Sequence, residues 1–113
     1  MSKHDDKVYL SHILASIDKV HQFVGDISFD SFRQNDMRID AVTRNFEIIG
    51  EASNNISPEF KSYHPEINFR PIISMRNWLI HGYDAVDLEV VWKTIKKDLP
   101  ELKKHIKKIL GNS

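Results

Sequence analysis

Apolar residues in the N-terminal half of the chain recur at three- and four-residue intervals, the spacing of a helix with one buried side. The first such stretch predicts one long helix, with Asp5 or Asp6 as its cap and Gly25 as its terminator. Its apolar positions are Leu10, Ile13, Leu14, Ile17, Val20 and Val24. After a turn region at 27–35, which has room for one helical turn, Asp36 is the predicted cap of a second helix that runs to about Asn55.

The second predicted helix has one apolar and one charged side. The apolar side carries Ile39, Val42, Phe46 and Ile49, and the opposite side carries Asp40, Arg44, Glu47 and Glu51. The apolar side therefore faces the core.

Helix signals continue through the C-terminal half. Ser57-Pro58 is a cap followed by a proline at the first helical position, and it opens a short helix that ends before Pro65. A further helix starts at 68–71 and stops at Gly82, and another begins at a cap, Asp87. Residues 98–100 (Asp-Leu-Pro) predict a kink or restart before the last helix, at about 100–110, which ends at Gly111. No segment alternates with a period of two, so we predict an all-α antiparallel helical bundle.

Composition narrows the class of protein. A chain of 113 residues has the size of one domain, here 1–113. It has no cysteine, which excludes disulfides, thiolate metal sites and cysteine nucleophiles. It also lacks an apolar run of about 18 residues and a signal-peptide pattern, so we expect a cytoplasmic protein without a membrane segment.

The charges balance overall but are unevenly distributed. The formal net charge is zero, yet residues 93–113 contain seven lysines against Asp98 and Glu101. This basic segment either attracts phosphates or forms the solvated side of a surface helix.

Arg76 lies in nearly continuous apolar sequence. On an ideal helix its apolar neighbours Ile72, Ile73, Leu79 and Ile80 fall within about 60° of it, so its stem lies against core-like surface. A buried guanidinium needs an anionic partner, either an internal carboxylate or the phosphate of a ligand. Glu47 and Glu51 are the candidate internal partners.

His81 is the histidine closest to that arginine along the predicted helix. It precedes Gly82 at the helix C-terminus, where the helix dipole favours the protonated imidazole. Because five residues turn a helix by about 140°, the side chains of Arg76 and His81 point in different directions on a straight helix. They act together only if the long arginine side chain reaches around the helix, if the helix is locally distorted, or if two copies of the chain each contribute one residue. The other histidines fit surface positions, namely His4, His12 and His21 on the first helix, His105 in the basic segment and His64 in a loop.

Arginine and histidine, without metal ligands or a glycine-rich phosphate loop, suit metal-independent RNA cleavage. That reaction needs groups that move protons and cations that hold the phosphate. One histidine per chain supplies only one proton-transfer group. A two-fold pair of sites in a dimer cleft supplies the second, so the sequence favours a dimer. No metal ion or cofactor is expected.

Three ordered blocks carry a resemblance to a known family. Residues 75–83 (MRNWLIHGY) resemble the R-x-x-x-x-H-x-Y motif of HepT-like toxins, which belong to the HEPN superfamily. Residues 40–52 resemble the second-helix signature of that family, and 86–92 with 98–100 resemble its next helix. The resemblance spans about residues 7–110.

The resemblance implies a helical homodimer that acts as a prokaryotic metal-independent ribonuclease toxin. It implies that Arg76 binds phosphate, that His81 transfers protons and that Asn77 orients the site. Arg44, Asn45 and Glu51 match the second-helix signature and receive supporting roles.

Family members are commonly paired with a minimal nucleotidyltransferase antitoxin, which in some pairs transfers AMP to the motif tyrosine, here Tyr83. Trp78 departs from the family pattern, since many relatives have a basic or polar residue there; we expect the indole to pack, with base stacking as the alternative. The rival function is a non-catalytic helical dimer that binds a nucleotidyltransferase or a nucleotide.

Overall fold

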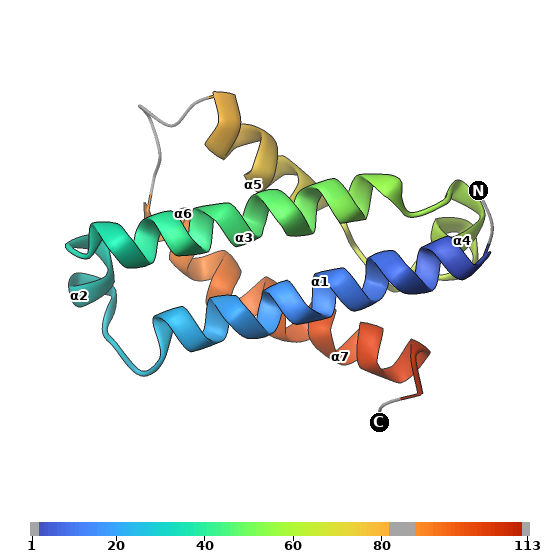
Figure 1. Cartoon of the computed structure of the whole chain (residues 1–113), viewed down its shortest axis with the longest axis horizontal. Coiled ribbons are helices and arrows are strands. Elements are labelled where there is room, and N and C mark those ends of the chain that lie inside the picture. Colours follow the sequence, from blue (N-terminus) through green and yellow to red (C-terminus); the bar gives the residue numbers. More distant parts are fainter. Residues whose placement is uncertain (1–2, 82–87, 112–113) are drawn as a thin grey trace.

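Two long antiparallel helices form the centre of the fold (Figure 1). The structure is a computed structural model that describes residues 3–81 and 88–111, with the backbone alone at 3, 4 and 78–81. α1 (Lys3–Val24) packs along α3 (Asp36–Asn55), and α5 (Arg70–His81) packs against α3 as well. The described residues contain no strand, which confirms the predicted all-α fold class.

The core is built from the apolar sides of these helices. α1 contributes an apolar stripe whose residues are at most 2% exposed, namely Leu10, Ile13, Ile17, Val20 and Val24. Val42, Phe46 and Ile49 of α3 are equally buried, as their spacing predicts, whereas Ile39 packs against the core while partly exposed. Because one cluster includes residues of α1, α3, α5 and α7, a single core positions the helices.

Two predicted helix caps are wrong. α1 begins at Lys3, so Asp5 and Asp6 lie inside its first turns. Asp6 is instead buried, and its carboxylate accepts hydrogen bonds from the Ser57 amide at 2.8 Å and the Ser57 hydroxyl at 2.7 Å. The cap of α3 is Asn35, one residue before Asp36, because the Asn35 side chain accepts a bond from the Arg38 amide at 3.1 Å.

Other element boundaries are confirmed. Gly25 follows α1 with a φ of +57°, a left-handed conformation that suits glycine at a helix end. The turn region at 27–35 contains the short helix α2 (Phe29–Arg33). Ser57 caps α4 (Pro58–Tyr63), whose first residue is Pro58.

The C-terminal half continues through the predicted kink without a break. α6 (Leu88–Lys93) leads into a π-helical segment, η2 (Thr94–Asp98), and then α7 (Leu99–Ile109). The Leu99 amide donates to the Thr94 carbonyl, five residues back, so the wider turn precedes Pro100, which has no amide proton to donate. The predicted cap Asp87 lies outside the described residues.

None of the described helices is both long enough and apolar enough to cross a membrane. The chain extends 42 × 30 × 20 Å, and α7 packs against α1, while η2, which precedes α7, also contacts α5. The packing of α5 against α3 positions Arg76 beside Gly50 of α3.

Candidate active site

The close approach of α5 to α3 occurs where Arg76 crosses Gly50. A Cβ atom at Gly50 would lie 2.5 Å from the Arg76 Cγ and 3.1 Å from its Cδ, and closer still to its Cβ. No side chain larger than hydrogen fits there without a shift of one helix. Gly50 therefore sets the path along which the Arg76 stem crosses α3.

The Arg76 guanidinium is held at two of its three nitrogens. Nη2 donates to Glu51 Oε2 at 2.9 Å, and Nη1 donates to Asn77 Oδ1 at 2.9 Å. Nε is buried and has no hydrogen-bond partner. With 24% of its side chain exposed, Arg76 keeps contact with solvent, and three of its five N–H donors make none of these bonds.

The predicted carboxylate partner of Arg76 is Glu51. Glu47, the other candidate, lies instead 3.6 Å from Arg44 through its Oε2. Arg44 is 72% exposed, so this second pair is weak and open to competition from a ligand.

Asn45 takes no part in the hydrogen bonds that hold the Arg76 guanidinium. It is buried in α3, its Nδ2 donates to the Ala41 carbonyl at 2.9 Å, and its Oδ1 has no partner. A buried amide oxygen without a donor carries a desolvation cost. Asn45 thus stands apart from the Arg76 contacts, and its supporting role stays a prediction.

The structure places the backbone of His81 as the last residue of α5, five residues after Arg76. The side chains of His81 and Trp78 are not described, and Tyr83 and Gly82 lie outside the described residues. The roles predicted for His81, Trp78 and Tyr83 stay predictions.

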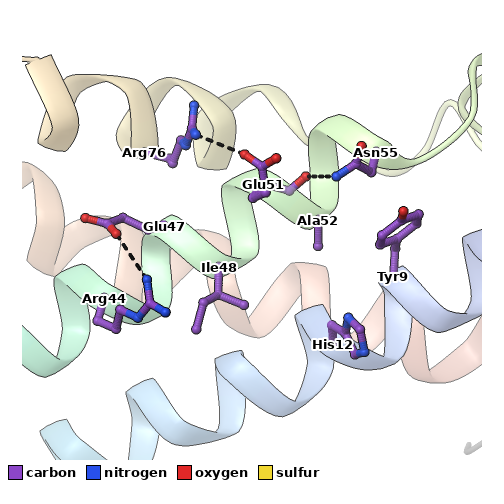
Figure 2. A pocket seen from close by; sticks show the side chains of 9 residues that line it. All are labelled: Tyr9, His12, Arg44, Glu47, Ile48, Glu51, Ala52, Asn55 and Arg76. Atoms are coloured by element: carbon purple, nitrogen blue, oxygen red, sulfur yellow. Dashed lines mark hydrogen bonds and ion pairs between the residues drawn. The ribbon is translucent and has the colours of Figure 1, made fainter.

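A pocket of about 370 Å³ opens beside Arg76 between α1 and α3, and we call it the α1–α3 pocket (Figure 2). Its lining residues are Tyr9 and His12 from α1, Arg76 from α5, and Arg44, Glu47, Ile48, Glu51, Ala52 and Asn55 from α3. Ile48 and Ala52 point from α3 toward α1, while the charged side chains lie along the α3 wall (Figure 2). Three of the predicted site residues, Arg44, Glu51 and Arg76, therefore share one cavity.

Tyr9 and His12 are the aromatic pocket residues that sequence reasoning missed as site residues. Their ring centroids are 6.4 Å apart and their planes are inclined at 82°. His12 is exposed as predicted, but its surface is the pocket wall opposite α3. The available signal was the three-residue spacing of two aromatic rings on the first helix, which places them on one side.

The basic C-terminal segment lies away from this pocket and has internal partners of its own. The Lys103 ammonium is 2.7 Å from Asp18 Oδ1, and the Lys96 ammonium lies 4.7 Å from the centre of the Trp92 ring. Both contacts hold surface lysines against the fold. Among the described residues, no group of three or more His, Cys, Asp or Glu side chains is arranged to hold a metal ion.

Comparison with known proteins places this sequence in a family. The sequence profile described as HepT-like, Ribonuclease HepT-like, matches residues 13–109. A probable ribonuclease HepT of Thermococcus cleftensis is 44% identical over 95% of this chain and 97% of its own length. A putative RNase of Methanocaldococcus jannaschii is 41% identical over 94% of this chain and 97% of its own. A putative RNase of Caldanaerobacter subterraneus is 40% identical over 90% of this chain and 91% of its own.

No solved structure gave a significant match. The profile and the relatives define a helical ribonuclease class, and the chain belongs to the HepT-like ribonuclease family. The resemblance read from the three sequence blocks and the predicted ribonuclease class are confirmed by this membership.

Proposed function

We propose that the whole chain, residues 1–113, acts as one HepT-like domain that cleaves RNA without a metal ion, as the cytoplasmic toxin of a prokaryotic toxin–antitoxin pair. The observation that carries this proposal is the geometry of Arg76. Its guanidinium is held by Glu51 and Asn77, and its side chain is 24% exposed and lines an open pocket. That combination suits a cation that binds a phosphate from solution.

An RNA phosphate competes with Glu51 for Arg76. Because Glu51 is 63% exposed, its carboxylate is readily hydrated when the guanidinium turns to a phosphate. Asn77 keeps its bond to Nη1 during this exchange and so limits the rotation of the guanidinium. Arg76 then stabilises the extra negative charge that develops on the phosphorane transition state.

His81 supplies proton transfer in the proposed reaction. The ribose 2′-oxygen attacks the adjacent phosphorus, its proton passes to one imidazole, and the bond from phosphorus to the 5′-oxygen breaks. A second imidazole, protonated at the start, donates its proton to the departing 5′-oxygen. The two histidines come from two copies of the chain in a homodimer cleft, since each chain carries one motif histidine.

The direct test is cleavage of total cellular RNA by the purified chain in excess EDTA. We expect cleavage by the wild type and a loss of at least about 100-fold in His81→Ala, the lower end of the usual contribution of general acid–base catalysis. His105→Ala is the matched control, because it removes a histidine from the basic segment, and it should cleave at the wild-type rate. Equal cleavage by His81→Ala would refute the assignment.

A minimal nucleotidyltransferase antitoxin is the proposed partner. In the proposed neutralisation, the Tyr83 hydroxyl attacks the α-phosphorus of ATP, pyrophosphate leaves and AMP stays on the tyrosine. The added phosphate brings negative charge and bulk beside the cations meant for RNA. Incubation with the partner and ATP should raise the mass by multiples of AMP, and Tyr83→Phe should show no increase. An unchanged wild-type mass with an active partner would leave steric inhibition instead.

One observation favours a second function, that of a non-catalytic helical dimer that binds the nucleotidyltransferase or a nucleotide. Arg76 is already neutralised by Glu51 in the isolated chain, which lowers its attraction for RNA. This function predicts partner binding without growth arrest on expression. Growth arrest that Arg76→Ala relieves would exclude it.

A further inference from the structure

The α1–α3 pocket has side chains suited to RNA binding that have no role in the proposed chemistry of Arg76 and His81. Its volume of about 370 Å³ lies in the range of small-ligand sites and is suited to one nucleotide rather than to a longer segment. The pocket has a guanidinium at Arg44 and another at Arg76, from two different helices (Figure 2). Two separated cations next to one cavity fit a ligand with successive phosphates.

The α1 wall of the pocket is aromatic. Tyr9 is half-buried against the core, which fixes its ring, while His12 is exposed beside it. Since their planes are nearly perpendicular, the two rings do not stack on each other. A ring anchored beside a cavity is a platform for an unstacked base, the usual way proteins hold single-stranded RNA.

The α3 wall offers polar and apolar contacts opposite these rings. Ile48 and Ala52 give apolar surface, and the Asn55 amide, which donates to the Glu51 carbonyl at 3.0 Å, has an oxygen left for a base edge. The Arg44–Glu47 contact is long at 3.6 Å, so a phosphate displaces Glu47 at small cost.

We propose that the α1–α3 pocket binds one nucleotide of a single-stranded RNA that runs across Arg76, with its base stacked on Tyr9 beside His12 and the neighbouring phosphate on Arg44. This inference rests on the proposed ribonuclease function and adds to it a subsite, with an aromatic platform contributed by α1. The pocket belongs to one chain and forms without a second copy.

Binding is measured separately from cleavage by use of an oligonucleotide that cannot react. The probe is a fluorescein-labelled, mixed-sequence 2′-O-methyl RNA of eight nucleotides, whose blocked 2′-oxygen has no proton to lose. Tyr9→Leu keeps apolar packing and removes the ring, so the Kd in fluorescence anisotropy should rise about 10-fold, the scale of one stacked base. Tyr9→Phe should stay within about two-fold of the wild type.

Tyr63→Leu is the matched control, because Tyr63 is 80% exposed on α4 and does not line the pocket. It should leave the Kd unchanged. If Tyr9→Leu binds as tightly as Tyr63→Leu, the proposed base platform is wrong.

Salt dependence tests the phosphate contact. Arg44→Ala should reduce the slope of log K against log salt by about 0.7, the value for one phosphate of a single strand. The control, Arg33→Ala, removes an exposed arginine that pairs with Asp30 on α2, and its slope should equal that of the wild type. An unchanged slope in Arg44→Ala would remove that residue from the subsite.

A third measurement needs no substitution and so stays decisive if Tyr9→Leu fails to fold. The same oligonucleotide carrying 4-thiouridine is cross-linked by light to the wild-type chain, and the labelled peptide is identified by mass spectrometry. We expect the label at residues 9–12. A label confined to the lysines of residues 93–108 would place RNA on the basic segment and overturn the proposal.

The outcomes separate the subsite from the proposed function. RNA cleavage that depends on His81, together with binding unaffected by Tyr9→Leu, would retain the ribonuclease and reject the subsite. Tyr9-dependent binding by a chain that cleaves nothing would retain the nucleotide pocket and reject the catalytic role.

Discussion

The apolar stripe of α1 and the Gly50–Arg76 contact show two ways in which helices of this fold meet. The stripe is fully covered and contains no polar atom in its side chains, so its contribution is stability. At the second contact a glycine admits an arginine stem, and the guanidinium keeps a buried Nε without a partner. The unpartnered Nε adds no stability, whereas the ion pair of Arg76 with the 63% exposed Glu51 is accessible to a competing anion.

The difference has a practical consequence for mutations. Changes in the apolar stripe should lower stability, and activity only through the amount of folded protein. Changes at the Gly50–Arg76 contact should lower activity more than stability. The experiments below test this separation in order of the expected change in folding free energy.

Removal of Ile17 from the apolar stripe should have the largest effect on stability. Ile17→Ala leaves a cavity in a site with no exposed surface, and we expect the free energy of unfolding to fall by about 2–5 kcal/mol. Val8→Ala on the same helix is the control, because Val8 is 50% exposed, and it should change stability by less than about 0.5 kcal/mol. Urea denaturation measures both. Equal losses would contradict the assignment of the stripe to the core.

Gly50→Ala should lower both the free energy of unfolding and the rate of RNA cleavage. The added methyl group meets the Arg76 stem, so we expect a loss of about 1–3 kcal/mol from overpacking and a fall of at least 10-fold in RNA cleavage as Arg76 moves. In a double-mutant cycle, Arg76→Gly removes Cβ, Cγ and Cδ, the three atoms that the new methyl group meets, and should restore part of the lost stability. Full additivity of the two stability changes would show that the close approach is not the cause.

Asp6→Ala should lower stability without a direct effect on catalysis. The buried carboxylate accepts two bonds from Ser57 at the start of α4, and its loss leaves both donors unpaired, at a cost of about 1–3 kcal/mol. Asp26→Ala, at an exposed position after α1, should change the free energy of unfolding by less than about 0.5 kcal/mol. If Asp6→Ala behaved like Asp26→Ala, the link from α1 to α4 would have no energetic role.

The smallest expected effect is at Glu66, on the exposed loop before α5. Its own backbone amide and then the His64 side chain hydrogen-bond the carboxylate, which holds the pKa of Glu66 below its usual 4.5. Since the folded pKa is the lower one, the contribution to stability is present above pH 4.5 and is lost as the pH falls through the folded value. NMR titration should give a Glu66 pKa below 4.5 that rises toward it in His64→Ala. A pKa at or above 4.5 in the wild type would contradict this.

Much of the fold could be predicted from the sequence because its signals are local. The spacing of apolar residues predicts α1 and α3, and Ser57-Pro58 predicts the start of α4. Asp6 could not be assigned, because an aspartate near a helix start predicts a cap and the sequence contains no sign that Ser57 would be its partner. The π turn between α6 and α7 could not be predicted, since a proline predicts only a kink or restart and the form it takes depends on hydrogen bonds further back in the chain.

Part of the candidate site could also be predicted, because its signals are local in the sequence. Arg76 was identifiable because a cation in apolar sequence needs a partner, and Glu51 was one of two carboxylates on the right side of α3. The need for a glycine at position 50 could not be predicted, because it arises only where α5 crosses α3. Tyr9 and His12 were missed as site residues because their role depends on a pocket formed with a helix more than thirty residues away.

The central claim is that Arg76 is a phosphate-binding cation rather than a structural ion pair. Its most direct test is the single-turnover rate of RNA cleavage in EDTA by Arg76→Ala, with Arg33→Ala as the control for loss of an arginine–carboxylate pair. We predict a rate at least about 100-fold below the wild type for Arg76→Ala, a Tm within a few degrees of it, and a rate within two-fold of it for Arg33→Ala. Wild-type cleavage by folded Arg76→Ala would contradict the claim.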